Sequence, residues 1–328
     1  MNLPQQQTIF SIANEVQFLE NALQVFRFQA ENCAVYKSYL GFLKIDPQQI
    51  NTLEAIPFLP IEFFKTNPVI SNHNQPEVIF SSSGTTGMTT SQHLVTDVSW
   101  YQNSFRKGFE LFYGDIKDYA FLALLPAYLE RSGSSLIYMV EDLIAATTTQ
   151  NSGFYLYNEE ELYQQLLHLQ QIKQSTVLIG VTFALLDFIE KHQLDFPELI
   201  LMETGGMKGR RKEIIREELH DQLCKGFGVP AIHSEYGMTE LLSQAYSLGE
   251  GLFNCVPWMK VLIRDTNDPF TILPDGKTGG INVIDLANIN SCSFIATQDL
   301  GKIHPNQMFE VLGRFDFSDI RGCNLLVG

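Results

Sequence analysis

The sequence predicts an α/β fold: a mostly parallel sheet covered by helices, followed by a smaller β-rich subdomain. Short apolar runs alternate with amphipathic helical patterns between residues 78 and 225, as expected for strands and the helices that cross over between them. From Trp258 onward, short strand-like segments are separated by Asp, Gly and Pro. With 328 residues, of which 45% are hydrophobic, the chain has enough material for a large core.

Residues 1–57 are predicted to form an N-terminal helical segment. Apolar residues recur at spacings of three and four in 14–28 and 31–43, which is the pattern of helices that bury one face. Prolines at 57, 60 and 68 then break the chain into extended pieces, because proline cannot continue a helix. The helical segment is therefore expected to end near residue 57.

Residues 58–256 are predicted to form an α/β nucleotide-binding region. Apolar runs predict four strands, each followed by a helical pattern. These strand and helix pairs are 78–80 with 97–112, 121–125 with 134–146, 176–180 with 184–192, and 199–202 with 211–225. The β-rich subdomain is expected at 257–312, and a hinge-like C-terminal tail at 313–328.

Charge and cysteine content exclude several classes of function. The 37 acidic and 22 basic residues leave a net charge of −15, which repels nucleic acid and anionic lipid surfaces. No signal peptide or membrane span is predicted. The five cysteines are scattered and odd in number, which argues against a disulfide framework or a zinc site and indicates a reducing, cytoplasmic setting.

The segment Ser81-Ser82-Ser83-Gly84-Thr85-Thr86-Gly87 directly follows the apolar run 78–80. Small residues let a backbone approach a ligand, and N–H and hydroxyl groups can surround phosphate oxygens. A solvated turn is the alternative interpretation. The segment is not the P-loop of kinases and GTPases, because that spacing fails and no lysine follows Gly87.

Four later segments combine glycine with a single charged or polar residue. Two of them follow apolar runs, which would place them at the carboxyl ends of strands, where open α/β sheets bind ligands. Each one alone is more often a turn than a site. The segments are Thr204-Gly205-Gly206-Met207-Lys208, Glu235-Tyr236-Gly237-Met238-Thr239-Glu240, Thr297-Gln298-Asp299-Leu300-Gly301 and Gly313-Arg314-Phe315-Asp316.

Taken in order, SSSGTTG, GGMK, EYGMTE, TQDLG and GRFDFSDIRG resemble the signature of the adenylate-forming superfamily, which includes acyl-CoA synthetases and luciferase. The segments IPFLPIEFFKT, LLPAYLERSGSSLIYMV and DIRGCNLLV are most similar to the acyl-protein synthetase (LuxE) family. The resemblance implies the large N-terminal domain of that fold. It also implies ATP-dependent activation of a carboxylic acid, expected to be a fatty acid, as an acyl-adenylate, and transfer of the acyl group to a thiol.

The resemblance implies two groups of nucleotide-binding residues. Thr239 would contact the α-phosphate and Glu240 would ligate Mg²⁺, which favours a carboxylate together with phosphate oxygens. The β- and γ-phosphates would lie against Ser82, Ser83, Gly84, Thr85, Thr86 and Gly87. The adenosine would be held by Gly205, Gly206, Met207, Lys208, Tyr236 and Gly237, with Tyr236 stacked on the base, Asp299 on the ribose hydroxyls, and Arg314 on the ribose or phosphate.

The sequence departs from the superfamily pattern in two places. Met88-Thr89-Thr90-Ser91 stands where a Pro-Lys pair is common, so one expected cation is missing. The mobile C-terminal domain that supplies a lysine to the α-phosphate is expected to be absent. Lys208, Arg210 or Arg211 would then substitute, or adenylation would be slow, or the fold would serve only for binding.

Cys323 is the candidate acyl acceptor, because acyl-protein synthetases carry the acyl group on a cysteine near the C-terminus. The alternative is an inert thiol in a terminal strand. The expected partners are a fatty or other carboxylic acid and a protein acceptor such as an acyl reductase or carrier. Two rival hypotheses are a coenzyme A-dependent ligase and a non-catalytic protein that binds a nucleotide or acyl group.

Overall fold

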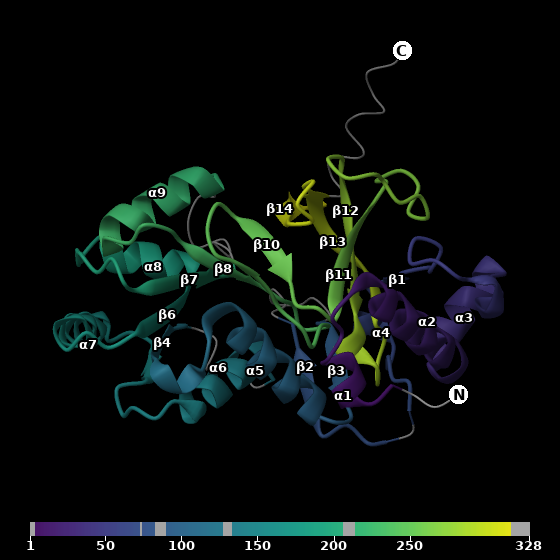
Figure 1. Cartoon of the computed structure of the whole chain (residues 1–328), viewed down its shortest axis with the longest axis horizontal. Helices are drawn as coiled ribbons and strands as arrows, with labels where there is room; N and C mark the ends of the chain where they lie inside the picture. Colours follow the sequence, from purple (N-terminus) through teal and green to yellow (C-terminus); the bar gives the residue numbers. More distant parts are fainter. Residues whose placement is uncertain (1–3, 73, 83–89, 127–132, 206–213, 316–328) are drawn as a thin grey trace, which may run out of the picture.

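A mixed sheet forms the centre of the structure, a computed structural model that describes residues 4–72, 74–82, 90–126, 133–205 and 214–315 (Figure 1). Among these residues the sheet has twelve strands in the order β11-β12-β13-β14-β10-β9-β8-β7-β6-β4-β5, and β1 pairs with β13. The strands are β1 (Leu59–Pro60), β4 (Ala120–Leu124), β5 (Gly153–Tyr155), β6 (Thr176–Val181), β7 (Ile200–Thr204), β8 (His233–Tyr236), β9 (Ala245–Ser247), β10 (Leu252–Cys255), β11 (Met259–Arg264), β12 (Thr278–Asp285), β13 (Phe294–Ile303) and β14 (Phe309–Arg314).

The predicted parallel sheet with covering helices is confirmed by strands β5, β4, β6, β7 and β8, which all pair in parallel. Every residue of β4 and β6 is buried, as in parallel strands covered on both faces. Helices α8 and α9 lie on one side of these strands, and α5 and α6 lie on the other (Figure 1). The helices are α5 (Ser99–Tyr113), α6 (Ser135–Ala146), α7 (Glu159–Gln171), α8 (Thr182–Ile189) and α9 (Arg216–Phe227).

The β-rich part predicted after Trp258 consists of β11 to β14, which pair antiparallel with one another in that order. In β13, buried residues alternate with partly buried ones, as expected for a strand with one face on the core. Strand β14 also pairs with β10, which in turn pairs with β9. The hydrogen-bonded sheet therefore continues from the parallel strands into the β-rich part.

The prediction that residues 78–80 form the first strand of the parallel sheet is wrong. Strand β2 (Val78–Ser81) pairs antiparallel with β3 (Gln92–Val95) in a separate two-stranded sheet. The run QHLV just after the Ser/Thr/Gly segment provides a local partner, and closing a short loop costs less entropy than pairing with a distant strand. The Ser/Thr/Gly segment therefore connects the two strands of a hairpin.

Other elements differ from the prediction in their limits. Strand β8 starts at His233, where the predicted strand of 231–233 ends, so Glu235 and Tyr236 lie within the strand. The preceding Pro230 cannot donate to a ladder, which favours the later start. Strand β5 and helix α7 were not predicted, although α7 buries Leu162, Leu166 and Leu169 at helical spacing.

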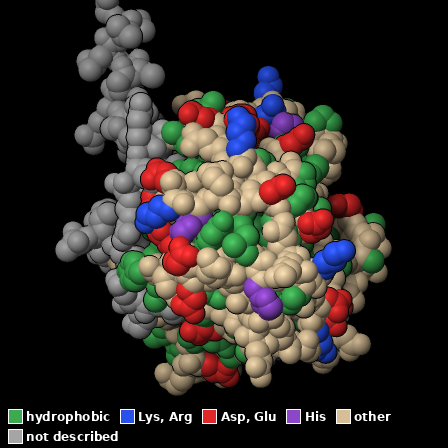
Figure 2. Space-filling model, turned by 90° about the vertical axis from the view of Figure 1, so that its left-hand side faces the viewer, with side chains coloured by type: hydrophobic (Ala, Val, Ile, Leu, Met, Phe, Trp, Pro, Cys, Tyr) green, Lys and Arg blue, Asp and Glu red, His purple; other side chains and the backbone are tan. Residues whose placement is uncertain are grey.

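The N-terminal segment folds into α1 (Gln6–Ile9), α2 (Glu15–Asn32) and α3 (Ala34–Leu43), beside the strands of the β-rich part (Figure 1). The side chain of Asn14 caps α2 by accepting from the backbone N–H of Gln17 at 3.0 Å. No helix of the described residues is long and apolar enough to cross a membrane. On the face in Figure 2, basic side chains lie among acidic ones.

Candidate functional site

The structure describes only part of the predicted nucleotide site. The predicted residues that it describes are Ser82, Gly205, Tyr236, Gly237, Thr239, Glu240, Asp299 and Arg314. The other predicted residues, Ser83, Gly84, Thr85, Thr86, Gly87, Gly206, Met207, Lys208 and Cys323, lie outside the described residues, as do Arg210 and Arg211.

Tyr236, Asp299 and Arg314 meet at one place although they come from three strands. The Tyr236 hydroxyl donates to Oδ2 of Asp299 at 2.9 Å, and the Arg314 Nε donates to Oδ1 at 3.2 Å. Tyr236 and Asp299 are buried, whereas 79% of the Arg314 side chain is exposed. Because each carboxylate oxygen can accept more than one hydrogen bond, Asp299 keeps acceptor capacity for ribose hydroxyls. The exposed guanidinium of Arg314 remains free to approach a ligand.

The segment that carries Asp299 is fixed by Thr297 and Arg264. The backbone N–H of Asp299 donates to the Thr297 hydroxyl at 3.1 Å. Arg264 donates to the backbone carbonyls of Thr297 and Ile281, at 2.5 and 2.7 Å. Burial lowers the pKa of Arg264. These contacts hold the backbone on either side of the Asp299 side chain.

Glu240 is a buried carboxylate at the base of the Ser/Thr/Gly segment. The Ser91 hydroxyl acts to lower the pKa of the Glu240 carboxyl group, and Ser91 is hydrogen-bonded to Ser82 at the other side of the hairpin. The Ser91 N–H donates to the Ser82 hydroxyl at 2.9 Å, and the Ser82 N–H donates to the Ser91 carbonyl at 3.1 Å. Glu240, the predicted metal ligand, therefore lies near Ser82, which is the first described residue of the predicted phosphate loop.

Burial raises the pKa of Glu240, while the Ser91 hydroxyl and the positive charges of Arg314 and Lys65 lower it. Within the described residues, no group of three or more His, Cys, Asp or Glu side chains could hold a metal ion. A single carboxylate fits Mg²⁺, which takes its remaining ligands from phosphate and water. The geometry at Glu240 therefore fits a metal that arrives with a nucleotide.

Two buried side chains fix the backbone of Thr239 and Glu240. The ring Nδ1 of His93 donates to the Thr239 carbonyl at 2.9 Å, and Nδ2 of Asn288 donates to the Glu240 carbonyl at 2.8 Å. Nε2 of His93 lies 2.9 Å from Oδ1 of Asn288. Burial lowers the pKa of His93 to about 4, whereas its hydrogen bonds with Thr239 and Asn288 act to raise it. Asp285 continues this support by accepting from the backbone N–H groups of residues 242 and 243.

Gly205 and Gly237 follow β7 and β8 directly, at neighbouring carboxyl ends. Gly205 has φ +70°, a conformation that favours glycine. A Cβ at Gly237 would lie 2.5 Å from Oε1 of Glu235, so glycine leaves room for that carboxyl group. Oε2 of Glu235 accepts from the Thr204 hydroxyl at 2.6 Å, and burial raises the pKa of Glu235 to about 7.

The fold resembles solved ligases over most of the chain. A 2-hydroxyisobutyryl-CoA ligase solved with an acyl-AMP matches 95% of this chain and 70% of its own, with a TM-score of 0.69 and 13% identity. ATP-bound MatB from Rhodopseudomonas palustris matches 75% of this chain and 49% of its own, with a TM-score of 0.56 and 17% identity. This chain has the fold of adenylate-forming acyl-CoA ligases.

Sequence comparison adds a shorter match to that fold. A stretch of 67 residues is 37% identical to a long-chain-fatty-acid–luciferin-component ligase, the LuxE type, from Photorhabdus luminescens. The stretch covers 20% of this chain and 57% of that sequence. No family profile matches the chain. This chain thus spans about half of the MatB chain and somewhat more than half of the luciferin-component ligase.

Four further residues of the candidate site were not predicted from the sequence. Glu235 and Lys65 lie inside segments that resemble the superfamily, EYGMTE and IEFFKT, but neither was given a role. His93 and Asn288 carry no local signal, because they are 195 positions apart and meet only in the folded chain. Their pairing depends on tertiary structure that periodicity does not encode.

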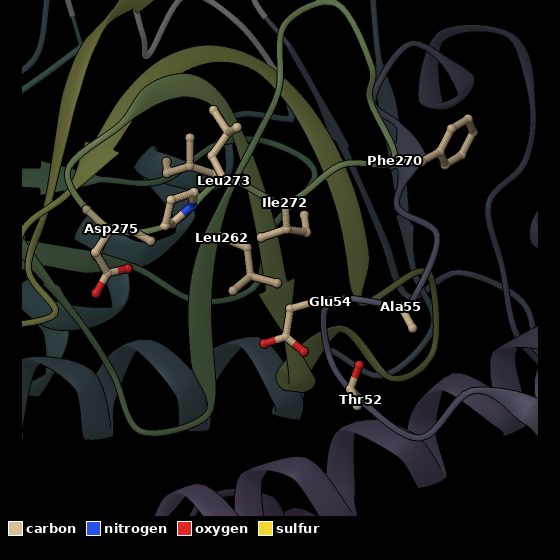
Figure 3. A pocket seen from close by; sticks show the side chains of 11 residues that line it. Thr52, Glu54, Ala55, Leu262, Phe270, Ile272, Leu273 and Asp275 are labelled. Atoms are coloured by element: carbon tan, nitrogen blue, oxygen red, sulfur yellow. The ribbon is translucent and has the colours of Figure 1, made fainter.

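A cavity of about 650 Å³ lies elsewhere, between the loop at Thr52–Ala55 and the segment that follows β11 (Figure 3). Apolar side chains, including Leu262, Ile272 and Leu273, point into it, and Glu54 lies at its edge. None of the residues predicted for the nucleotide lines this cavity. We therefore do not assign the candidate active site to this cavity, despite its size.

The described cysteines are poor nucleophiles. Cys33, Cys224, Cys255 and Cys292 are all free thiols. Burial raises the pKa of each, to about 12 for Cys255, which disfavours the reactive thiolate. Within the described residues, no cysteine is activated for acyl transfer.

Proposed function

We propose that this protein is an ATP- and Mg²⁺-dependent ligase that activates a carboxylic acid as an acyl-adenylate and passes the acyl group to a thiol. The observation that carries the proposal is the meeting of Tyr236, Asp299 and Arg314 in a chain with the fold of acyl-CoA ligases. The positive charge of Arg314 also lowers the pKa of Glu240. We assign nucleotide binding to region 58–256 together with Asp299 and Arg314 on the following strands.

In the first half-reaction, a carboxylate oxygen of the acid attacks the α-phosphorus of ATP. The bond from that phosphorus to the bridging oxygen breaks, and pyrophosphate leaves with its electron pair. The Tyr236 ring would border the adenine, and Asp299 would accept hydrogen bonds from the ribose hydroxyls. Thr239 would donate to the α-phosphate, and residues 82–87 would hold the β- and γ-phosphates.

The buried carboxylate of Glu240 would hold Mg²⁺, which supplies neutralising charge to the phosphates when it is bound. The His93 and Asn288 contacts keep Thr239 and Glu240 in register with the hairpin that carries Ser82. Such preorganisation matters because the oriented groups stabilise developing charge without having to reorganise during the reaction.

In the second half-reaction, a thiolate attacks the carbonyl carbon of the acyl-adenylate. The carbon–oxygen bond to the phosphate breaks, AMP leaves, and the thiol proton passes to solvent. We propose Cys323 as the thiol, a long-chain fatty acid as the substrate, and an acyl reductase or carrier protein as the next acceptor. The match to the luciferin-component ligase supports this choice, as does the raised pKa of every described cysteine.

Coenzyme A is the alternative thiol. The 2-hydroxyisobutyryl-CoA ligase, whose fold this chain shares, has been solved with coenzyme A. In that case, AMP formation would require coenzyme A and would not depend on Cys323.

Intact-mass measurement tests both halves of the proposal. The protein would be incubated with ATP, Mg²⁺ and a panel of fatty and aromatic acids, with and without coenzyme A. We expect an acyl adduct on the wild type that is absent from Cys323→Ser, whereas Cys224→Ser, the matched control at a partly exposed cysteine, retains it. AMP without an adduct, formed only with coenzyme A, would support the alternative, and no AMP with any acid would refute acid activation.

A further inference from the structure

The proposed site needs a cation that its phosphate loop does not supply. The net charge of −15 opposes the approach of a polyphosphate, so local positive charge is required. Met88-Thr89 occupies the place where the superfamily commonly has Pro-Lys. Among the described residues, Arg314 is the predicted cation, and it already pairs with Asp299. A second cation near Glu240 would help to neutralise the negative charge of the bound polyphosphate.

Short helix α4 (Phe63–Thr66) is anchored beside the strand that carries Asp299. Leu59 of β1 pairs in parallel with Ile295, and the backbone N–H of Ile61 donates to the Ala296 carbonyl at 3.0 Å. The Gln298 amide donates to the Glu62 carboxylate at 2.6 Å. These contacts tie the start of α4 to residues 295–298 of β13.

The other side of α4 packs against the hairpin. The buried ring of Phe64 meets the ring of His93 edge-on, with centroids 5.9 Å apart. His93 holds the carbonyl of Thr239, so α4 lies next to the residues that precede Glu240. Lys65 therefore extends from a short helix held between β13 and β3.

The packing of α4 brings Lys65 to the part of the hairpin that holds the backbone of Thr239, the residue before Glu240. The Lys65 side chain is partly buried and makes no hydrogen bond or ion pair with any residue that the structure describes, whereas its backbone N–H donates to the Glu62 carbonyl at 3.0 Å. Glu240 is 4% exposed and has no cation within ion-pair distance among the same residues. An ammonium and a buried carboxylate that both lack an ion-pair partner among the described residues can be bridged by a polyphosphate with its metal.

We propose that the Lys65 ammonium contacts the β- and γ-phosphates of the bound nucleotide and stays with pyrophosphate as it leaves. This inference rests on the proposed adenylation function, and it deepens that function by naming the cation. Lysine suits the role because its ammonium is a compact charge with three donors. No proton transfer by Lys65 is required, since the ammonium serves only to neutralise charge.

Calorimetric binding of MgATP and adenosine tests this role. Lys65→Met is expected to weaken MgATP binding about ten- to hundredfold, the effect of losing one charge-assisted hydrogen bond. Adenosine should bind unchanged, because it lacks phosphates. Lys65→Arg should retain most of the MgATP affinity, and Lys37→Met, which removes the same charge from the exposed face of α3, should bind as the wild type does.

The outcomes separate this inference from the proposed function. If Lys65→Met binds MgATP as tightly as the wild type, or loses adenosine affinity equally, Lys65 does not contact the phosphates. If the wild type binds MgATP but shows no acid-dependent exchange of pyrophosphate into ATP, the proposed adenylation function is refuted. The conclusion that Lys65 contacts the phosphates is then unaffected. A wild type that does not bind MgATP overturns both.

Discussion

Burial changes the protonation of Glu235 in the candidate site. Glu235 follows Ser234 in β8 and has the Thr204 hydroxyl as its hydrogen-bond partner. Burial, with a smaller contribution from the charge of Glu203, raises its pKa from 4.5 to about 7. The carboxyl group is therefore partly protonated near neutral pH, next to the residue proposed to border the adenine.

This pKa predicts a pH-dependent stability that Glu235→Gln removes. Because the folded pKa lies above the unfolded one, the protonated group favours folding at low pH, and this contribution is lost as pH rises from about 4.5 to about 7. Relative to Glu235→Gln, the wild type should lose about 2 to 3 kcal/mol of unfolding free energy across this interval. Urea unfolding of both proteins at pH 4.5 and 8 measures the difference.

A matched control removes a carboxylate at an exposed position. Glu217→Gln, in the first turn of α9, should leave the wild-type pH profile of unfolding unchanged. Parallel pH profiles for the wild type and Glu235→Gln would show that Glu235 titrates normally in the folded protein.

At the level of residues, the sequence predicted the polar groups of the site better than the network that supports them. Tyr236, Asp299 and Arg314 stand in segments where glycine and a single charge occur together, and such segments are visible locally. The sequence around His93 gives no local indication that this histidine supports the site. Its role depends on Asn288, which follows β12 some two hundred positions later.

The hairpin of β2 and β3 brings the proposed phosphate loop to the residues after β8. Ser82 and Ser91 close the hairpin, and His93 donates to the carbonyl of Thr239, the residue before Glu240. Ser91 and strand β3 therefore support both the loop and the backbone that precedes the predicted metal ligand. The sequence predicted β2 but not its partner, because a short strand of mixed polarity has little periodicity to identify it.

His93 is expected to act as a positioning residue. His93→Leu removes the donor to the Thr239 carbonyl and should slow acid-dependent pyrophosphate exchange about ten- to hundredfold. His93→Asn can place its amide nitrogen where Nδ1 lies and should retain most of the rate. Exchange rates and melting temperatures of both variants check this expectation.

Tyr36→Phe controls for a general loss of stability. It removes another buried hydrogen bond, the one from the Tyr36 hydroxyl to the Pro57 carbonyl, and should leave the exchange rate unchanged. Equal rates for His93→Leu and His93→Asn would show that the hydrogen bond to Thr239 has no role in catalysis.

The sheet must bend to bring the side chains of Tyr236 and Asp299 together. Tyr236 on β8 and Asp299 on β13 are four steps apart in strand order, which would separate them by about 19 Å in a flat sheet. Their side chains instead meet at 2.9 Å. The rings of Phe253 and Phe309, from the strands between them, pack against Tyr236 at 5.9 and 5.5 Å and fill the inside of the bend.

The sequence predicted both halves of this sheet but not their junction. Continuous apolar runs identify the parallel strands, and turn residues identify the antiparallel ones. The pairings of β10 with β9 and β14 join the two halves, and they depend on strand partners that no local pattern specifies. The contact between Tyr236 and Asp299 is a consequence of that junction.

Isotope transfer tests acid activation most directly. If the acid carboxylate attacks the α-phosphorus, one of its oxygens becomes the bridging oxygen of the acyl-adenylate and stays with AMP when the thiol takes the acyl group. A substrate acid labelled with ¹⁸O at both carboxylate oxygens should therefore yield AMP that carries one ¹⁸O, detected by mass spectrometry. AMP without the label would show that the acid never attacks the phosphorus, and it would contradict the proposed mechanism.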